Sequence, residues 1–166
     1  FYDMFGNDAM DYVAKWNGST WVPLGHNGYG GGSVSNAVNC LALDAGGNLY
    51  AGGSFSVYNT SGVYVGSYIA RWNGTDWYAM GSNGSGGPAV NSTINAIATS
   101  GTDVYAGGYF TNINNNGTVL TAADYVAKWD GSNWSALGSN GSGEGSLGVN
   151  GYVYELAAIG SDLYVG

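Results

Sequence analysis

The stretch "KWNGSTW" (15–21) is the first of three places where a tryptophan, a short polar turn and a second tryptophan follow one another. The others are "RWNGTDW" (71–77) and "KWDGSNW" (128–134), and the three together use all six tryptophans of the chain. The leading tryptophans stand at positions 16, 72 and 129, a period of about 56 residues. A fixed period of this length indicates a repeat architecture.

Further landmarks recur in the same order around each tryptophan pair. An alternating apolar stretch precedes it, in "AVNCLAL" (37–43), "TINAIAT" (93–99) and "YVYELAA" (152–158). A stretch rich in tyrosine and glycine comes next, in "NLYAGGSF" (48–55), "DVYAGGYF" (103–110) and "DLYVG" (162–166). A Leu-Gly or Met-Gly step follows each second tryptophan, at 24–25, 80–81 and 137–138. Each unit therefore predicts four short strands joined by tight turns rich in asparagine and glycine.

Four short strands in a repeat of about 56 residues are typical of a β-propeller blade. We expect one all-β domain with three repeat equivalents. They are a half blade at 1–33, blades at 34–89 and 90–148, and a half blade at 149–166. The 31 glycines interrupt every helical pattern of apolar residues, and only 8% of residues are charged.

The tryptophans are expected to have a structural role. The turn brings the two tryptophans of each hairpin together, and short glycine-rich strands offer little else to pack. An exposed stacking surface is the alternative. The residues concerned are Trp16, Trp21, Trp72, Trp77, Trp129 and Trp134.

The stretches "VAKWDGSNWSALGSNGSG" (126–143) and "LYAGGSF" (49–55) resemble the Kelch-like, tryptophan-rich propeller repeats of secreted or surface proteins of microbes. A double glycine after a strand, followed by spaced tyrosine and tryptophan, is shared with the Kelch pattern. Tyr68 and Trp72 stand closer together than their Kelch counterparts. The resemblance covers nearly the whole chain and implies the blade fold and an extracellular setting. Because Kelch-type propellers bind proteins or glycans or hold copper, it implies no single function.

The half blades at the two ends predict association with other chains. Closed propellers have about four to eight blades, so three equivalents are not expected to close alone. Unpaired strand edges recruit other chains. Three outcomes stay open: a piece of a longer array, two chains that complete a six-bladed ring, or an open filament. We expect self-association of this end-to-end kind.

The net charge of −8 argues against two classes of partner. Nucleic-acid binding needs clustered cations, and so does a polybasic contact with a membrane surface. No apolar run approaches the roughly 20 residues that span a bilayer. We expect neither a nucleic-acid partner nor a membrane span.

The sequence offers little to a catalytic site, which needs converging acids, bases or ligands. His26 is the one histidine and lies in a glycine-rich stretch, and Cys40 is the one cysteine. No serine lies in a recognisable nucleophile motif. We expect no enzyme and no catalytic or metal residue.

Calcium is the one cofactor left open, because acids recur at two positions of the repeat. Asp103 and Asp162 begin the second strand, and Asp11 and Asp124 precede the third. Acids at such turns more often bond the local backbone.

All three cations stand at one repeat position, directly before the first tryptophan of each pair: Lys15, Arg71 and Lys128. We expect each to pair locally with an acid or an aromatic ring, and a ring of cations facing an acidic ligand is the alternative. Exposed aromatics would serve a glycan or protein ligand. The candidates are Tyr29, Tyr58, Tyr64 and Tyr78.

Asn-x-Ser/Thr sequons are more frequent than chance, which predicts about three for this composition. They begin at Asn17, Asn59, Asn73, Asn83, Asn91, Asn116, Asn133 and Asn140. Asn-Gly turns explain part of the excess, and both explanations place these asparagines in loops where a glycan could be attached.

These observations predict a non-catalytic, secreted or cell-surface repeat protein with a structural or adhesive role. It would assemble end to end through its incomplete blades, as a glycosylated filament in one form. The alternative is a lectin-like module, a propeller that binds glycans or proteins.

Overall fold

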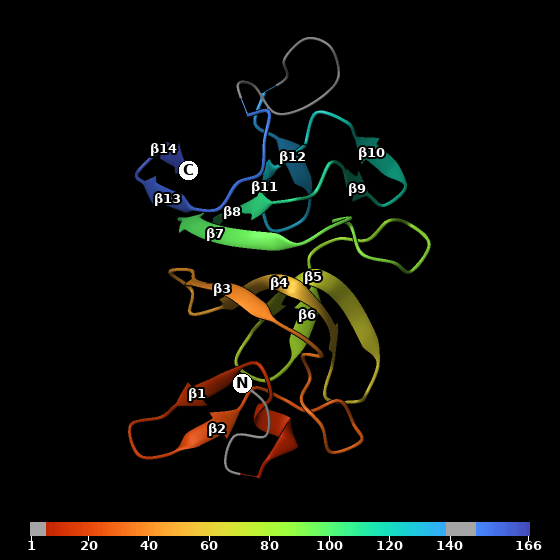
Figure 1. Ribbon diagram of the computed structural model, residues 1–166, viewed down its shortest axis with the longest axis vertical. Coiled ribbons are helices and arrows are strands. Elements are labelled where there is room, and N and C mark those ends of the chain that lie inside the picture. Colours follow the sequence, from red (N-terminus) through yellow and green to blue (C-terminus); the bar gives the residue numbers. More distant parts are fainter. Residues whose placement is uncertain (1–5, 139–148) are drawn as a thin grey trace.

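The computed structural model describes residues 6–138 and 149–166 and shows a chain built of antiparallel β-sheets (Figure 1). A short 3-10 turn, Asp8–Met10, leads into a hairpin of β1 (Ala14–Trp16) and β2 (Trp21–Pro23). A second hairpin ends the chain, with β13 (Leu156–Ile159) and β14 (Asp162–Val165). Two four-stranded sheets lie between these hairpins.

The first sheet follows the chain in order, β3-β4-β5-β6. Its strands are β3 (Val38–Leu43), β4 (Leu49–Tyr58), β5 (Tyr64–Trp72) and β6 (Trp77–Ala79). Asn73 shapes the turn between β5 and β6, because its Oδ1 accepts hydrogen bonds from the Thr75 and Asp76 amides. Gly74 adopts the positive φ of +101° that this turn requires.

The second sheet repeats this order with β7, β8, β11 and β12. Its strands are β7 (Ile94–Ser100), β8 (Asp103–Gly108), β11 (Val126–Trp129) and β12 (Trp134–Ala136). An extra hairpin of β9 (Ile113–Asn115) and β10 (Thr118–Leu120) is inserted before β11. Asn116 and Gly117 form its two-residue turn with φ of 49° and 99°. The first sheet instead extends β4 and β5 over the corresponding stretch.

The structure confirms the predicted all-β fold and its antiparallel sheets. Each of the two complete units forms one four-stranded sheet. None of these sheets closes into a barrel or propeller within 6–138 and 149–166, so the propeller prediction stays a prediction.

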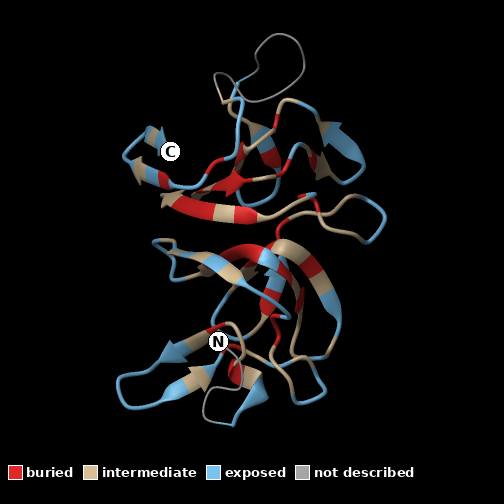
Figure 2. Ribbon diagram, in the orientation of Figure 1, coloured by how far each residue is buried: buried red, intermediate tan, exposed pale blue. Residues whose placement is uncertain are grey.

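The first strands of successive units, β3, β7 and β13, lie side by side. The Asn39 side-chain amide donates to the Ile94 carbonyl at 3.1 Å, and Asn95 donates to the Val153 carbonyl at 3.0 Å. The same repeat position, Asn39 in one unit and Asn95 in the next, therefore makes the same hydrogen bond to the following unit. We call each contact between neighbouring units a junction. Figure 2 shows buried residues concentrated in the two central sheets, whereas the terminal hairpins are mostly exposed.

The double glycine of each unit allows this close approach. A Cβ at Gly52 would lie 2.5 Å from Cγ2 of Ile94 and 2.7 Å from Sγ of Cys40. A Cβ at Gly107, one unit later, would overlap the side chain of Val153. Only glycine leaves room for the next unit at this position.

Tyr12, Tyr68 and Tyr125 share a backbone conformation that the sequence did not predict. Their φ angles are 64°, 69° and 63°, although bulky residues rarely adopt positive φ. The Val126 amide donates to the Asp124 carbonyl at 2.7 Å and closes a three-residue turn around Tyr125. This turn redirects the chain just before the third strand of the unit.

Candidate functional site

The tryptophans of each hairpin do lie together. Their ring centroids are 5.7, 5.5 and 5.4 Å apart in chain order, with interplanar angles between 53° and 58°. This shared geometry follows from direct cross-strand pairing, such as that of Trp129 with Trp134.

The second tryptophan of a pair joins neighbouring units. Trp77 Nε1 donates to the Leu24 carbonyl at 2.7 Å, and Trp134 Nε1 donates to the Met80 carbonyl at 2.7 Å. Both side chains are buried, with 1% and 2% of their surface exposed. Each bond reaches back to the Leu-Gly or Met-Gly step of the preceding unit.

The N-terminal pair differs because no described unit lies on its outer side. Trp16 is 52% exposed and Trp21 is 41% exposed. The Trp21 indole has no acceptor among the described residues. The same tryptophan motif therefore packs against a neighbouring unit in two of its copies and faces solvent in the third.

The three cations lie on three different sheets, and two of them are paired locally. Lys128 forms a salt bridge of 3.1 Å with Asp103, and this hydrogen bond raises the pKa of the lysine. The Arg71 guanidinium lies over the Tyr78 ring, 5.4 Å from its centroid. Lys15 is exposed and has no partner within the described part of the chain.

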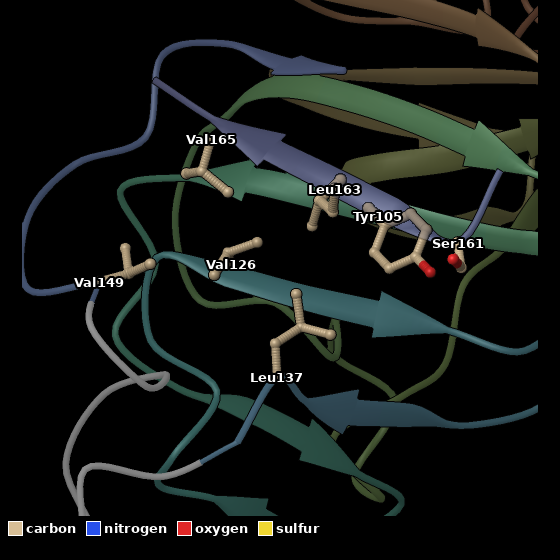
Figure 3. A pocket seen from close by; sticks show the side chains of 7 residues that line it. All are labelled: Tyr105, Val126, Leu137, Val149, Ser161, Leu163 and Val165. Carbon is tan, nitrogen blue, oxygen red and sulfur yellow. The ribbon is translucent and has the colours of Figure 1, made fainter. Parts of the chain in front are cut away.

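A cavity of about 300 Å³ lies at the C-terminal face (Figure 3). We call it the C-terminal cavity. Val126 and Leu137 line one side, and Leu163 and Val165 of β14 line the other. Tyr105 closes one end. Its lining surface is polar and apolar in equal part, and it opens to solvent.

A second cavity, of about 370 Å³, lies where the N-terminal hairpin meets the first sheet. We call it the N-terminal cavity. Lys15 lines it beside Leu41, Leu43 and Trp72. Leu41 and Leu43 are exposed on β3. Both ends of the described chain therefore carry a hollow beside their terminal hairpin, and the N-terminal one is the more apolar.

The predicted ligand-binding tyrosines do not form one surface within the described residues. Tyr29 is 90% exposed, whereas Tyr58 and Tyr64 pack edge to face with centroids 6.0 Å apart. The Tyr64 hydroxyl also lies 3.0 Å from Ser67 Oγ. Tyr78 lies under Arg71.

A different tyrosine cluster was missed in the sequence. The ring centroid of Tyr109 lies 4.6 Å from that of Tyr152 and 5.9 Å from that of Tyr154. The ring centroids of Tyr125 and Tyr152 are 5.9 Å apart. The available signal was the spacing of Tyr152 and Tyr154, because residues two apart in an extended chain share a face. Tyr109 and Tyr125 come from distant parts of the chain, so no local pattern showed them.

The sequon asparagines mostly shape turns. Oδ1 of Asn17 accepts from the Ser19 and Thr20 amides, and Asn59 and Asn83 make similar bonds. Asn59 and Asn83 are half-buried, and Asn140 lies outside the described residues. The exposed members are Asn17, Asn73, Asn91, Asn116 and Asn133.

The reactive residue types are dispersed. His26 Nδ1 accepts a hydrogen bond from the Gly28 amide at 3.1 Å. Burial raises the pKa of the Cys40 thiol to about 12, so the thiol is protonated at neutral pH. Across 6–138 and 149–166 no three His, Cys, Asp or Glu side chains gather as a metal site would require.

The acids considered for calcium have local contacts. Asp103 pairs with Lys128, and Asp162 lies 3.5 Å from Ser161 Oγ. The backbone carbonyls of Asp11 and Asp124 accept from amides two residues later. The Asp103 contact joins two strands, whereas those of Asp11, Asp124 and Asp162 are made with residues one or two positions away.

Comparison with protein-family models, with curated proteins and with solved structures finds no match for this chain. No helix in the described part of the chain has the length and apolar character needed to cross a membrane. The functional argument therefore depends on the geometry of the units and their junctions.

Proposed function

We propose that the chain is a non-catalytic structural protein of the cell exterior, built of propeller-type blades and assembling end to end. The observation that carries the proposal is the contrast among the tryptophan pairs. Trp77 and Trp134 are buried in completed junctions, whereas Trp16 and Trp21 present the same motif to solvent.

The bonding between units supports a structural role. Repeat proteins derive much of their stability from interfaces between neighbouring units. Here the junction between the two central sheets combines an asparagine amide, a tryptophan indole and a glycine contact, and each outer junction has part of this set. The N-terminal hairpin presents the tryptophan part of this set, and among the described residues its Trp21 indole has no acceptor, which favours a further unit as its ligand.

The exposed sequons support an extracellular, glycosylated form. In Asn17 and Asn73 the Oδ1 atom holds the turn and the residue is exposed, and Nδ2 of Asn17 makes one long hydrogen bond of 3.4 Å, to Thr20 Oγ1, that a glycan would replace. With so few charged residues, attached sugars would supply the hydration that keeps the surface soluble.

Sedimentation of the 166-residue chain over a wide concentration range tests the assembly. We expect species larger than the 17.0 kDa chain to grow with concentration in the absence of any ligand. A single 17.0 kDa species at every concentration would reject it. Mass spectrometry of protein from the natural source tests the sugars, which would add mass in steps of one sugar residue.

A binding module is the second candidate, and the tyrosine cluster around Tyr109 and Tyr152 favours it. Exposed aromatic rings stack on the apolar faces of sugars and on protein side chains. Tyr152 and Tyr154 are each more than half exposed. Binding on a glycan array that is lost in Tyr152→Ala and kept in Tyr29→Ala would support this function.

A further inference from the structure

We infer that the seam between two copies is a composite four-stranded sheet. In it β13 and β14 of one copy pair with β1 and β2 of a second copy. This inference rests on the proposed end-to-end assembly and specifies the contacts that make it.

The second sheet provides the template for the seam. There β8 pairs with β11 in a register that sets Val104 opposite Trp129 and Tyr105 opposite Lys128. The residues at 13–16 repeat the "VAKW" of 126–129 without change. Within the described residues β1 pairs only with β2, and β14 pairs only with β13. Each of these strands therefore has one edge that no described strand pairs with.

Transferring the template register brings opposite charges together. Lys15 would lie opposite Tyr164, and Trp16 opposite Leu163. Asp162 holds the repeat position of Asp103. Because Lys128 reaches Asp103 at 3.1 Å within one sheet, Lys15 is placed to reach Asp162 across the seam.

The same arrangement completes the missing tryptophan bond. Each interior tryptophan donates to the Leu-Gly or Met-Gly step of the preceding unit. For the composite sheet the preceding unit is the second sheet, whose equivalent residue is Leu137. Trp21 of the second copy would therefore donate to the Leu137 carbonyl of the first.

The C-terminal cavity matches the apolar part of this contact. Between the two central sheets, Ile69 and Met80 share a buried cluster with Trp129 and Trp134. Val126 and Leu137 are the equivalents of Ile69 and Met80, and both line the open C-terminal cavity. The side chains that would fill it are therefore Trp16 and Trp21 of the second copy.

One hydrogen bond of the interior junctions has no counterpart at the seam. Asn39 and Asn95 each bond the next unit through their side-chain amides. Tyr154 replaces them in the third unit and lies in the tyrosine cluster instead. The seam thus lacks one hydrogen bond, and its association is expected to be reversible.

The first test changes the charge pair and measures the dissociation constant by sedimentation. Lys15→Asp and Asp162→Lys are each expected to weaken association by about tenfold, as the loss of one charged pair at a seam predicts. The double variant, which restores opposite charges, is expected to recover most of the affinity. This rescue separates a direct contact from a general loss of folding.

The second test uses a matched pair of tryptophan variants. Trp21→Phe keeps a ring but removes the indole donor, and it is expected to weaken association by about tenfold with unchanged monomer stability. Trp77→Phe is the control, because its bond lies inside the chain. It is expected to lower monomer stability and leave association intact.

The outcomes distinguish the inference from the proposed function. If the chain associates but Lys15, Asp162 and Trp21 variants all associate like the parent, the composite sheet is wrong and the proposed assembly survives. If the chain never associates, both are wrong. Weaker association of each single charge variant, with recovered association of the double variant, supports both the composite sheet and the proposed assembly.

Discussion

Ser33 is a buried residue whose hydroxyl has no hydrogen-bond partner within the described chain. Its counterpart one unit later is Ala89, which is buried in the same way. An unsatisfied buried hydroxyl is destabilising. We therefore expect Ser33→Ala to raise the free energy of unfolding by about 1 kcal/mol, measured by denaturant titration. A loss of stability would show that the hydroxyl is satisfied in solution.

Cys40 and Tyr50 lie on neighbouring strands and predict a pH dependence. Burial raises the pKa of Cys40 from 9.0 to about 12, and burial together with a hydrogen bond to Asp44 raises the pKa of Tyr50 from 10.0 to about 12. At a pH between the lower and the higher value of each group, Cys40 and Tyr50 are deprotonated in the unfolded chain but still protonated in the folded chain. The free energy of unfolding is therefore expected to fall as pH rises through this window.

Denaturant midpoints at about pH 8 and about pH 11 check this dependence. Cys40→Ala is the matched control, because it removes the thiol and should reduce the fall. Equal midpoints at the two pH values would contradict the prediction.

At the scale of the element, the contact between β4 and β7 depends on a missing side chain. Gly52→Ala would place a methyl group 2.5 Å from Cγ2 of Ile94. Ile94 and Cys40, the two residues that the methyl group would meet, are both held in strands. The overpacking is therefore expected to cost about 1–3 kcal/mol in the free energy of unfolding. Gly151→Ala, which meets nothing within 4 Å, should change it by less than about 0.5 kcal/mol. Equal effects would show that the sheets separate easily.

Most strands could be predicted from the sequence, and the hairpin of β9 and β10 is the exception. The four expected strands form in both complete units, and the turn between the third and fourth is set by local Asn73-Gly74 and Asp130-Gly131 chemistry. The hairpin of β9 and β10 was not predicted. Its stretch in the first unit continues β4 and β5. Equivalent stretches thus form different elements, because the second unit carries an Asn116-Gly117 turn and the first unit has other residues there.

At the scale of the whole molecule, association should appear as concentration-dependent thermal stability. Association through the folded state alone stabilises it by mass action. We expect the apparent Tm to rise with chain concentration, measured by calorimetry. In the Trp21→Phe variant this dependence should be weaker. A Tm that does not vary with concentration in the parent chain would contradict the prediction.

The sequence by itself determined the repeat, the all-β class and the pairing of the tryptophans. Those features depend on residues close together in the chain, such as the turn between Trp129 and Trp134. Only the tertiary structure decided which tryptophan pairs are buried and which are exposed. The "VAKW" stretches at 13–16 and 126–129 are identical, yet Lys128 is paired and Lys15 has no partner among the residues that the structure describes. What differs is the neighbouring unit, because burial and pairing are properties of the packed neighbours that a local motif does not contain.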